Sequence, residues 1–266
     1  MKVENTGFQP SQFMYWSEEN QKLQNQKLEE VIKRIEEKTA LQQSTLAIFD
    51  LDGTLFDNRT RTLFILREIS EQFDIELPEL SAVMERYHDH GVVEYVPANT
   101  LKRMGVKSEK EIAFIEKEWA KRFFSDEYQK FDLPLNGAKA YVTRAHKAGA
   151  TIIYLTGRDV GRMLVGTTDC LRLYGFPVGI VGTMMLVKDD VTVEDEIFKG
   201  DVVDYLKRLG DVVAIFENEP MNSNILHKAF PDALSFFVLT QHRPDAPELN
   251  EGIYKLRDFK VRQFLI

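Results

Sequence analysis

Short apolar runs alternate with longer amphipathic segments along most of the chain. Runs rich in Val, Ile, Leu and Phe predict buried strands at residues 44–49, 151–155, 178–181, 212–216 and 234–239. Apolar positions that recur every three or four residues predict intervening helices at residues 137–147, 160–174, 200–209 and 222–230. Strands separated by such helices are typical of a parallel sheet with helices on both faces. We therefore expect an α/β, Rossmann-like core.

A further helical pattern precedes the first strand, over residues 17–43. Ser17 is suited to cap this helix, and one apolar stripe runs along it, formed by Leu28, Val31, Ile32 and Ile35. We expect the stripe to pack on the main domain. Contact with a second copy, giving a homo-oligomer through this N-terminal helix, or with another partner is the alternative.

A second helical stretch interrupts the strand pattern between residue 58 and about residue 134. Its apolar positions share one helical face at Leu63, Leu66, Ile69 and Phe73, and another at Ile112, Ile115, Trp119 and Phe123. We therefore expect three parts: an N-terminal helical extension (1–43), an α/β core (44–58 and 135–266) and an inserted all-helical unit (59–134).

Composition and charge exclude several classes of protein. The 266 residues are 44% apolar, enough for a full hydrophobic core, and the net charge of −8 repels polyanions. We therefore expect no nucleic-acid partner and no membrane association. The single cysteine, Cys170, permits neither an intrachain disulfide nor a thiolate metal cluster. Because the chain has no secretory-signal pattern and no apolar run near the roughly 20 residues of a membrane span, we expect a cytoplasmic location.

Polar side chains follow several of the predicted strands. Asp50-Leu51-Asp52-Gly53-Thr54 comes directly after the first strand, and Thr156-Gly157-Arg158 comes after the second. Glu217-Asn218-Glu219 follows the strand at 212–216, and Lys199 precedes the helix before that strand. In a parallel sheet these positions meet at one edge. Because clustered carboxylates repel one another and Mg²⁺ prefers oxygen ligands, the sequence predicts a magnesium site at which a bound substrate is attacked.

Two of these motifs resemble those of a known family. Asp50-Leu51-Asp52-Gly53-Thr54 resembles the first signature motif of the haloacid dehalogenase-like (HAD) hydrolase superfamily, and Leu155-Thr156-Gly157-Arg158 resembles the second. The resemblance covers about residues 44–242 and implies that Asp50 is a nucleophile that becomes an aspartyl phosphate. It implies that Asp52 is the general acid and base.

The resemblance also assigns the remaining site residues. Thr156 and Gly157 would hold phosphoryl oxygens, and Lys199 would neutralise charge on the nucleophile and the transferring group. The Asp50 and Glu217 side chains and the Asp52 carbonyl would bind Mg²⁺.

Three positions have two interpretations each. Lys188 competes with Lys199, but the acidic pair after it suggests a turn, so we favour Lys199. Arg158 is equally suited to contact phosphate or to brace its loop by pairing with a carboxylate. Glu219 is a fallback metal ligand, although a solvated turn carboxylate is the favoured interpretation.

Where the chain enters the insert, substrate contact and a capping or solvated role are equally compatible with Asp57, Asn58, Arg59 and Arg61.

The acidic motif departs from the family pattern, which usually has two aspartates or a Gly-Asp start with a later Asp. Glu217 keeps the charge but reaches one methylene further, whereas Asn218 keeps a carbonyl oxygen and loses the charge. Because Mg²⁺ demands near-octahedral geometry, this change bears on metal affinity more than on the reaction class.

The insert resembles the C1 cap of the superfamily, a helical lid that excludes water and favours small substrates. The resemblance therefore implies a Mg²⁺-dependent phosphatase that hydrolyses a small phosphorylated metabolite, a phosphomonoester. A phosphomutase or phosphotransferase with the same residues is one alternative. A catalytically weak protein that binds a phosphate-bearing ligand or docks a partner is another, and its support is the altered Glu217-Asn218-Glu219 motif.

Overall fold

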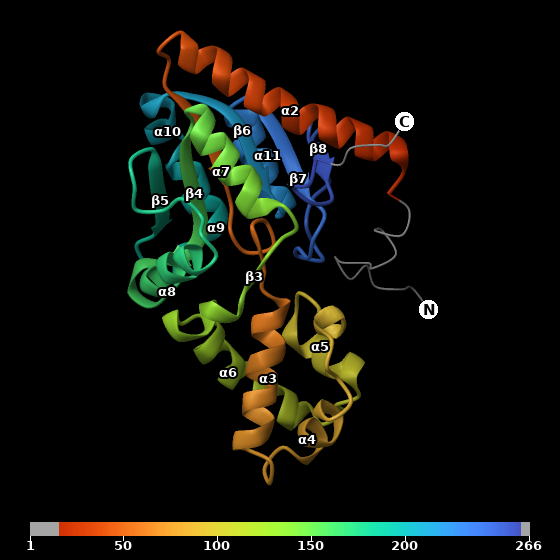
Figure 1. The fold of residues 1–266 in the computed structure, drawn as a ribbon. Helices are drawn as coiled ribbons and strands as arrows, with labels where there is room; N and C mark the ends of the chain where they lie inside the picture. The colour runs from red at the N-terminus through yellow and green to blue at the C-terminus, as the bar shows by residue number, and fades with distance from the viewer. Residues whose placement is uncertain (1–15, 262–266) are drawn as a thin grey trace.

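A six-stranded parallel sheet forms the centre of the protein in the computed structural model, which describes residues 16–261 (Figure 1). The remaining residues, 1–15 of the expected N-terminal extension and 262–266 of the expected core, lie outside the described part. Every strand pairing in the sheet is parallel. The strands run in the order β5 (Thr183–Lys188), β4 (Thr151–Asp159), β1 (Thr45–Phe49), β6 (Asp211–Glu217), β7 (Leu234–Val238) and β8 (Tyr254–Leu256). This order confirms the expected Rossmann-like core.

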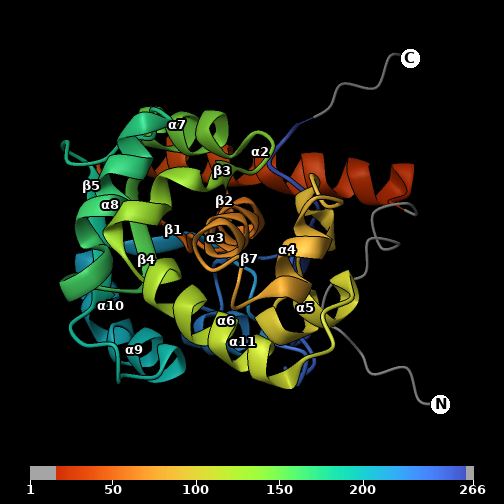
Figure 2. The ribbon, with the colours of Figure 1, turned by 90° about the horizontal axis from the view of Figure 1, so that it is seen from below.

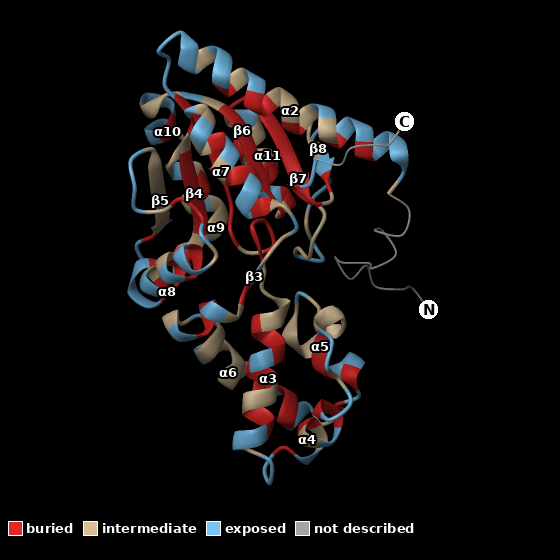
Figure 3. Ribbon diagram, viewed as in Figure 1, coloured by how far each residue is buried: buried red, intermediate tan, exposed pale blue. Residues whose placement is uncertain are grey.

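Helices cover both faces of the sheet, because successive residues of a buried strand point to opposite sides. In β1, Ala47 and Phe49 belong to the apolar cluster under α2 (Glu18–Ala40), α7 (Ala138–Ala148) and α8 (Val160–Leu173). Leu46 and Ile48 belong to the cluster under α9 (Asp195–Asp201), α10 (Val203–Leu209) and α11 (Pro220–Ala229). All five residues of β1 are buried, as the colouring of Figure 3 shows for the central strands.

Helix α2 lies along the core on the side away from the other helical part of the molecule (Figure 1). The Ser17 side chain accepts a hydrogen bond from the Asn20 amide and so caps the helix as expected. The predicted apolar stripe is buried in the same cluster as β1 and α7, which confirms packing on the main domain. A homo-oligomer formed through α2 would therefore have to use the outer, largely exposed face of this helix (Figure 3).

A separate group of helices, which we call the cap, projects from the carboxyl ends of the strands (Figures 1 and 2). It consists of α3 (Arg59–Gln72), α4 (Pro78–Met84), η1 (His90–Val92), α5 (Pro97–Met104), α6 (Glu109–Phe123) and η2 (Asp126–Phe131). Its buried apolar residues form a cluster of their own, which includes Leu66 and Ile69 of α3 and Ile112 and Ile115 of α6. The two chain crossings between core and cap pair as an antiparallel ribbon of β2 (Phe56–Asp57) and β3 (Leu133–Pro134).

Two of the predicted elements differ from the structure. The strand expected at residues 178–181 is wrong, because Gly179 has a φ of 67° that breaks an extended run, and β5 begins only at Thr183. Ile180 and Val181, whose apolar side chains suggested a buried strand, are 53% and 95% exposed.

The helix expected at 200–209 is instead two short helices, α9 and α10, and Lys199 lies in the last turn of α9 rather than ahead of a helix. The acidic residues Asp195 and Glu196 in the first turn of α9 suit the positive end of its dipole. Among the helices of residues 16–261, none combines the length and apolar character needed to span a bilayer.

Candidate active site

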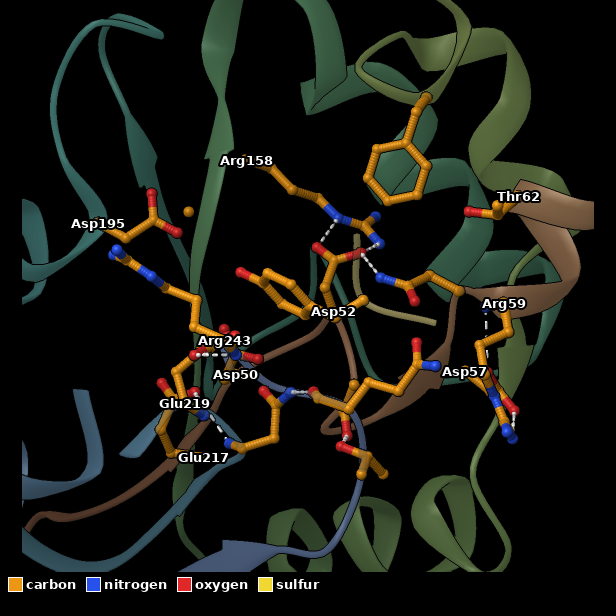
Figure 4. Close-up of a pocket in the computed structure, with 18 of the residues that line it drawn as sticks. Asp50, Asp52, Asp57, Arg59, Thr62, Arg158, Asp195, Glu217, Glu219 and Arg243 are labelled. Carbon is orange, nitrogen blue, oxygen red and sulfur yellow. Dashed lines mark hydrogen bonds and ion pairs between the residues drawn. The ribbon is translucent and has the colours of Figure 1, made fainter. Parts of the chain in front are cut away.

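A cavity of about 1210 Å³ lies between the carboxyl ends of the strands and the cap. The core contributes Asp50, Asp52, Lys199 and Glu217 to its wall, together with the loop after β4. The cap contributes residues from η1 to the start of α5 and from the end of α6. Figure 4 shows the acidic and basic side chains of both parts pointing into this space.

The loop after β1 holds its two aspartates in fixed positions. The Asp50 amide donates to the Phe216 carbonyl at 3.0 Å, which ties the start of the loop to β6. Gly53 has a φ of 75°, and a Cβ atom there would lie only 2.2 Å from Nδ2 of Asn218, so this position requires glycine. The Thr54 hydroxyl donates to Oδ1 of Asn218 at 3.1 Å and connects the loop to the acidic motif.

Lys199 joins the carboxylates of two strand ends. Its Nζ lies 2.8 Å from Oδ1 of Asp50 and 2.6 Å from Oε2 of Glu217, and all three side chains are buried. Lys188, the rival candidate, lies at the end of β5 and contacts Asp195 at 2.7 Å instead. The structure thus brings Lys199, and not Lys188, to Asp50.

The charges of this triad influence one another strongly. Burial would lower the pKa of Lys199, but Asp50 and Glu217 together raise it well above its ordinary value, so the side chain stays an ammonium. Burial and the neighbouring Glu217 raise the pKa of Asp50, and Lys199 opposes this shift. Burial also raises the pKa of Glu217. When both carboxylates are ionised, the single ammonium between them leaves one excess negative charge, which a bound cation would neutralise.

The residues around the triad fit a Mg²⁺ ion in the type of their donor atoms. Asp50 and Glu217 offer carboxylate oxygens, the ligands that Mg²⁺ takes in proteins. The Asn222 oxygen Oδ1 also lies at this wall, buried and without a hydrogen-bond partner. Glu217 Oε1 already accepts the amides of Asn218 and Glu219, both at 2.9 Å. Within residues 16–261, no group of three or more His, Cys, Asp and Glu side chains is arranged to bind a metal.

Asp52 is paired with two arginines. Arg158 binds it through two nitrogens, Nε at 2.7 Å from Oδ2 and Nη2 at 2.8 Å from Oδ1 (Figure 4). Arg61 Nη2 lies 2.7 Å from Oδ1. Burial alone would raise the pKa of Asp52, but these guanidinium groups hold it well below its usual range. Asp52 is therefore a carboxylate in this structure, and Arg158 braces its loop, one of the two roles considered from the sequence.

A second carboxylate, Asp132, completes a ring of charges that we call the arginine–aspartate cluster (Asp52, Arg61, Asp132 and Arg158). Asp132 Oδ2 accepts from Arg158 Nη2 at 2.8 Å, and Oδ1 lies 2.9 Å from Arg61 Nε in an ion pair without hydrogen-bond geometry. Burial raises the pKa of Asp132 to about 6, although both arginines oppose it. Arg61 and Asp132 come from the cap and its connection, so the cluster ties the cap to the core.

The sequence interpretation missed the importance of Arg61 and Asp132. A signal for Arg61 exists, because it lies four residues before Ile65 and eight before Ile69, on the buried face of α3. A charged residue on an apolar helical face needs a buried partner. Asp132, which follows η2, has no comparable signal, since its environment depends on how the cap meets the core.

Three other predicted site residues lie at the end of β4 and in the acidic motif. Thr156 is fully buried and lies outside the cavity wall, and its hydroxyl accepts from the Arg158 amide at 3.3 Å. Gly157 lies on the wall, where a Cβ atom would be 2.2 Å from Oδ2 of Asp195. Glu219 is half-buried rather than solvated, with hydrogen bonds from the Arg243 amide and from the Tyr95 hydroxyl of the cap.

The central position of β1 in the sheet, the paired aspartates after it and the helical cap between β1 and β4 match the arrangement that the sequence resemblance implies. No protein-family model and no curated protein matches the chain.

Solved structures similar to this chain include proteins described as phosphatases. CbbY from Rhodobacter sphaeroides in complex with phosphate is 14% identical, covers 82% of this chain and 95% of its own, and has a TM-score of 0.45. A class C acid phosphatase from Bacillus anthracis with tungstate bound is 16% identical over 80% of this chain and 70% of its own, with a TM-score of 0.42. A candidate phosphatase from Clostridium difficile is 17% identical over 74% of this chain and 86% of its own, with a TM-score of 0.48. At this distance, what the chain does has to be argued from its own site.

Proposed function

We propose that this protein is a Mg²⁺-dependent phosphatase that hydrolyses a small phosphomonoester through a phosphorylated Asp50. The observation that carries the proposal is the buried contact of Lys199 with both Asp50 and Glu217, at 2.8 and 2.6 Å, on the wall of a cavity. Buried charges cost free energy, and perturbed ionisable groups that face a cleft are typical of catalytic sites.

The reaction takes place in two displacements at phosphorus. An oxygen of Asp50 attacks the phosphorus atom, and the bond to the leaving alcohol breaks with its electron pair, so the alcohol oxygen takes up a proton. Water then attacks the phosphorus of the aspartyl phosphate, releasing inorganic phosphate and restoring the carboxylate. Lys199 offsets negative charge on Asp50 and on the transferring group in both steps.

Mg²⁺ supplies positive charge that offsets the charge of the transferring phosphoryl group when it is bound. The Asp50 and Glu217 side chains and the Asp52 carbonyl would hold it. The Gly157 amide and the Thr156 hydroxyl remain our candidates for holding phosphoryl oxygens. For Thr156 this role requires its hydroxyl to turn from the Arg158 amide toward the cavity.

Asp52 handles the protons in this scheme. As the carboxylate seen between Arg61 and Arg158, it is in the form that accepts a proton from the attacking water. The first displacement needs the protonated form of Asp52, which donates a proton to the oxygen of the leaving alcohol. Because Arg61 enters from the cap, we infer that it leaves Asp52 during the cycle when the cap moves.

The cap restricts the substrate to a small molecule, because it lies over the carboxyl ends of the strands (Figure 1) and lines the cavity with α6 and the segment after η1. A small phosphorylated metabolite is therefore the expected substrate, and nucleic acid is not. The net charge of −8 also argues against a nucleic-acid substrate, because it repels polyanions. We propose that the reaction takes place in the cytoplasm.

Replacement of Asp50 by Asn tests the proposal. With Mg²⁺ and a panel of phosphomonoesters, phosphate release by Asp50→Asn should fall by about a thousandfold or more, because the amide is a poor nucleophile. Asp201→Asn, an exposed change on the helix that carries Lys199, should leave the rate unchanged. Chelation of Mg²⁺ should abolish wild-type turnover. Substantial Mg²⁺-dependent hydrolysis by a folded Asp50→Asn protein would refute the assignment.

A further inference from the structure

Three aromatic side chains at the end of α6 form part of the cavity, and we call them the aromatic wall (Trp119, Phe123 and Phe124). Trp119 and Phe123 stack with ring centroids 4.4 Å apart. Phe124 meets both rings edge-on, at 5.9 Å from Trp119 and 5.1 Å from Phe123. The three rings therefore form a rigid corner rather than three independent side chains.

The aromatic wall lies next to the catalytic groups. The guanidinium carbon of Arg61 is 3.8 Å from the centroid of Phe123, and the same guanidinium contacts Asp52 at 2.7 Å. Contacts therefore connect Asp52 to Arg61, Arg61 to Phe123 and Phe123 to the Trp119 ring. Asp50 and the three rings line the same cavity.

Burial distinguishes the aromatic wall from the core of the cap. Ile112 and Ile115, earlier on the same helix, are 2% and 0% exposed, whereas Phe124 is 38% exposed and Trp119 is half-buried. The indole N–H of Trp119 donates to Oγ1 of Thr62 at 3.2 Å, which satisfies its polar atom and fixes the ring plane. The cavity side of the rings remains apolar surface that a ligand can cover.

The contacts of each ring leave Trp119 as the stacking surface. Phe123 has Trp119 on one side and the Arg61 guanidinium over its ring, and Phe124 has the Arg162 guanidinium 5.6 Å from its centroid. Trp119 stacks on Phe123 with one face, and no other aromatic ring of residues 16–261 stacks on its second face.

Building on the proposed function, we propose that the substrate is a phosphomonoester whose alcohol carries a planar aromatic ring, which packs on Trp119 and against Phe124. Nucleoside monophosphates and phosphate esters of aryl-bearing alcohols share this chemistry. An aromatic ring at this place covers apolar surface and gains the favourable geometry of stacked and edge-on pairs.

Two matched pairs of esters test this inference. Adenosine 5′-monophosphate is compared with ribose 5-phosphate, and benzyl phosphate with cyclohexylmethyl phosphate, so that each pair releases the same kind of primary alcohol. We expect kcat/KM to be roughly tenfold or more higher for the aromatic member of at least one pair. A preference within the first pair indicates a nucleotide substrate, and a preference within the second pair indicates an aryl ester.

Two variants locate the preference. Trp119→Ala should remove the preference, so that kcat/KM becomes equal within each pair. Phe114→Ala should keep the preference. Phe114 is on the same helix as Trp119 and is as exposed as Phe124, at 38%, but it lies outside the cavity and packs on Phe73. If Trp119→Ala does not fold, Phe124→Ala removes a more exposed ring of the same wall. Equal kcat/KM within both pairs, or a preference that survives loss of the wall, would overturn the inference.

A binding measurement separates this inference from the proposed function. The chain has two tryptophans, so Trp16→Phe leaves Trp119 as the only one. In that variant, adenosine 5′-monophosphate or benzyl phosphate should change the tryptophan fluorescence, and their ring-free counterparts should not. If no ester is hydrolysed, the phosphatase assignment fails, but the fluorescence change still shows whether a ring-bearing ligand binds at Trp119. Absence of any ring-specific signal would contradict the site itself.

Discussion

At the residue scale, the site consists of buried charges that compensate one another. Lys199 pairs with Asp50 and Glu217, and the arginine–aspartate cluster pairs two guanidinium groups with two carboxylates. Breaking a buried pair by removing one partner costs several kcal/mol, about 3–5, because the remaining charge is uncompensated. Each of these charged side chains therefore depends on its partner for stability. A substitution that keeps the shape of a side chain but removes its charge tests this dependence.

Asp132 gives a prediction on pH. Its pKa is raised to about 6 in the folded protein, above the roughly 3.9 of an unfolded aspartate. The folded protein therefore binds more protons than the unfolded chain between about pH 4 and pH 6, and this group stabilises the fold less as the pH rises through that range. In urea unfolding, the free energy of unfolding of wild type relative to Asp132→Asn should decrease from pH 4 to pH 6 and then level off. A difference that grows with pH would show that the ion pairs with Arg61 and Arg158 outweigh burial.

At the element scale, the sequence predicted most of the core because its strands are both apolar and short. The strand at 45–49 and the helix at 18–40 match the expected positions closely, since a fully buried strand and a single apolar stripe are strong local signals. The predicted strand at 178–181 failed because one glycine with positive φ redirects the chain, and composition does not reveal φ.

The candidate site shows the same division between local and non-local information. Asp50 and Glu217 follow from their places at strand ends, because parallel topology alone brings those ends together, and Lys199 reaches both from the last turn of α9. The partners of Asp52 do not follow, since Arg61 and Asp132 reach it only through the way the cap docks on the core. The spacing of Trp119 and Phe123 predicted a shared apolar helical face, but both side chains, together with Phe124 just after the helix, also line the cavity.

At the scale of the whole molecule, cap and core are joined by several polar contacts around the cavity. Besides the arginine–aspartate cluster, Gln241 of the core donates to the Val93 carbonyl of the cap, and Tyr95 is hydrogen-bonded to Glu219. The Asp126 carboxylate at the start of η2 accepts from the Gly166 amide of α8 at 2.6 Å. The structure therefore shows the cap docked on the core.

Arg61 gives a prediction on cap docking. Arg61→Met removes the guanidinium that contacts both Asp52 and Asp132, so the cap should separate from the core more often. Amide hydrogen exchange should speed up in the connecting strands β2 and β3 and in η2, while exchange in the central sheet stays unchanged. Arg67→Met is the matched control, because Arg67 lies on the same helix and its side chain donates to the Tyr87 carbonyl within the cap. Equal exchange in wild type and Arg61→Met would show that the cluster does not hold the cap.

The most direct measurement is the chemical state of Asp50 during turnover. Wild-type protein hydrolysing a phosphomonoester with Mg²⁺ is quenched in acid within the first turnovers, digested, and analysed by mass spectrometry. We predict one phosphoryl group on Asp50, present in wild type and absent from Asp50→Asn. Steady hydrolysis with Asp50 unmodified at every quench time, or with the phosphoryl group on another residue, would contradict the account.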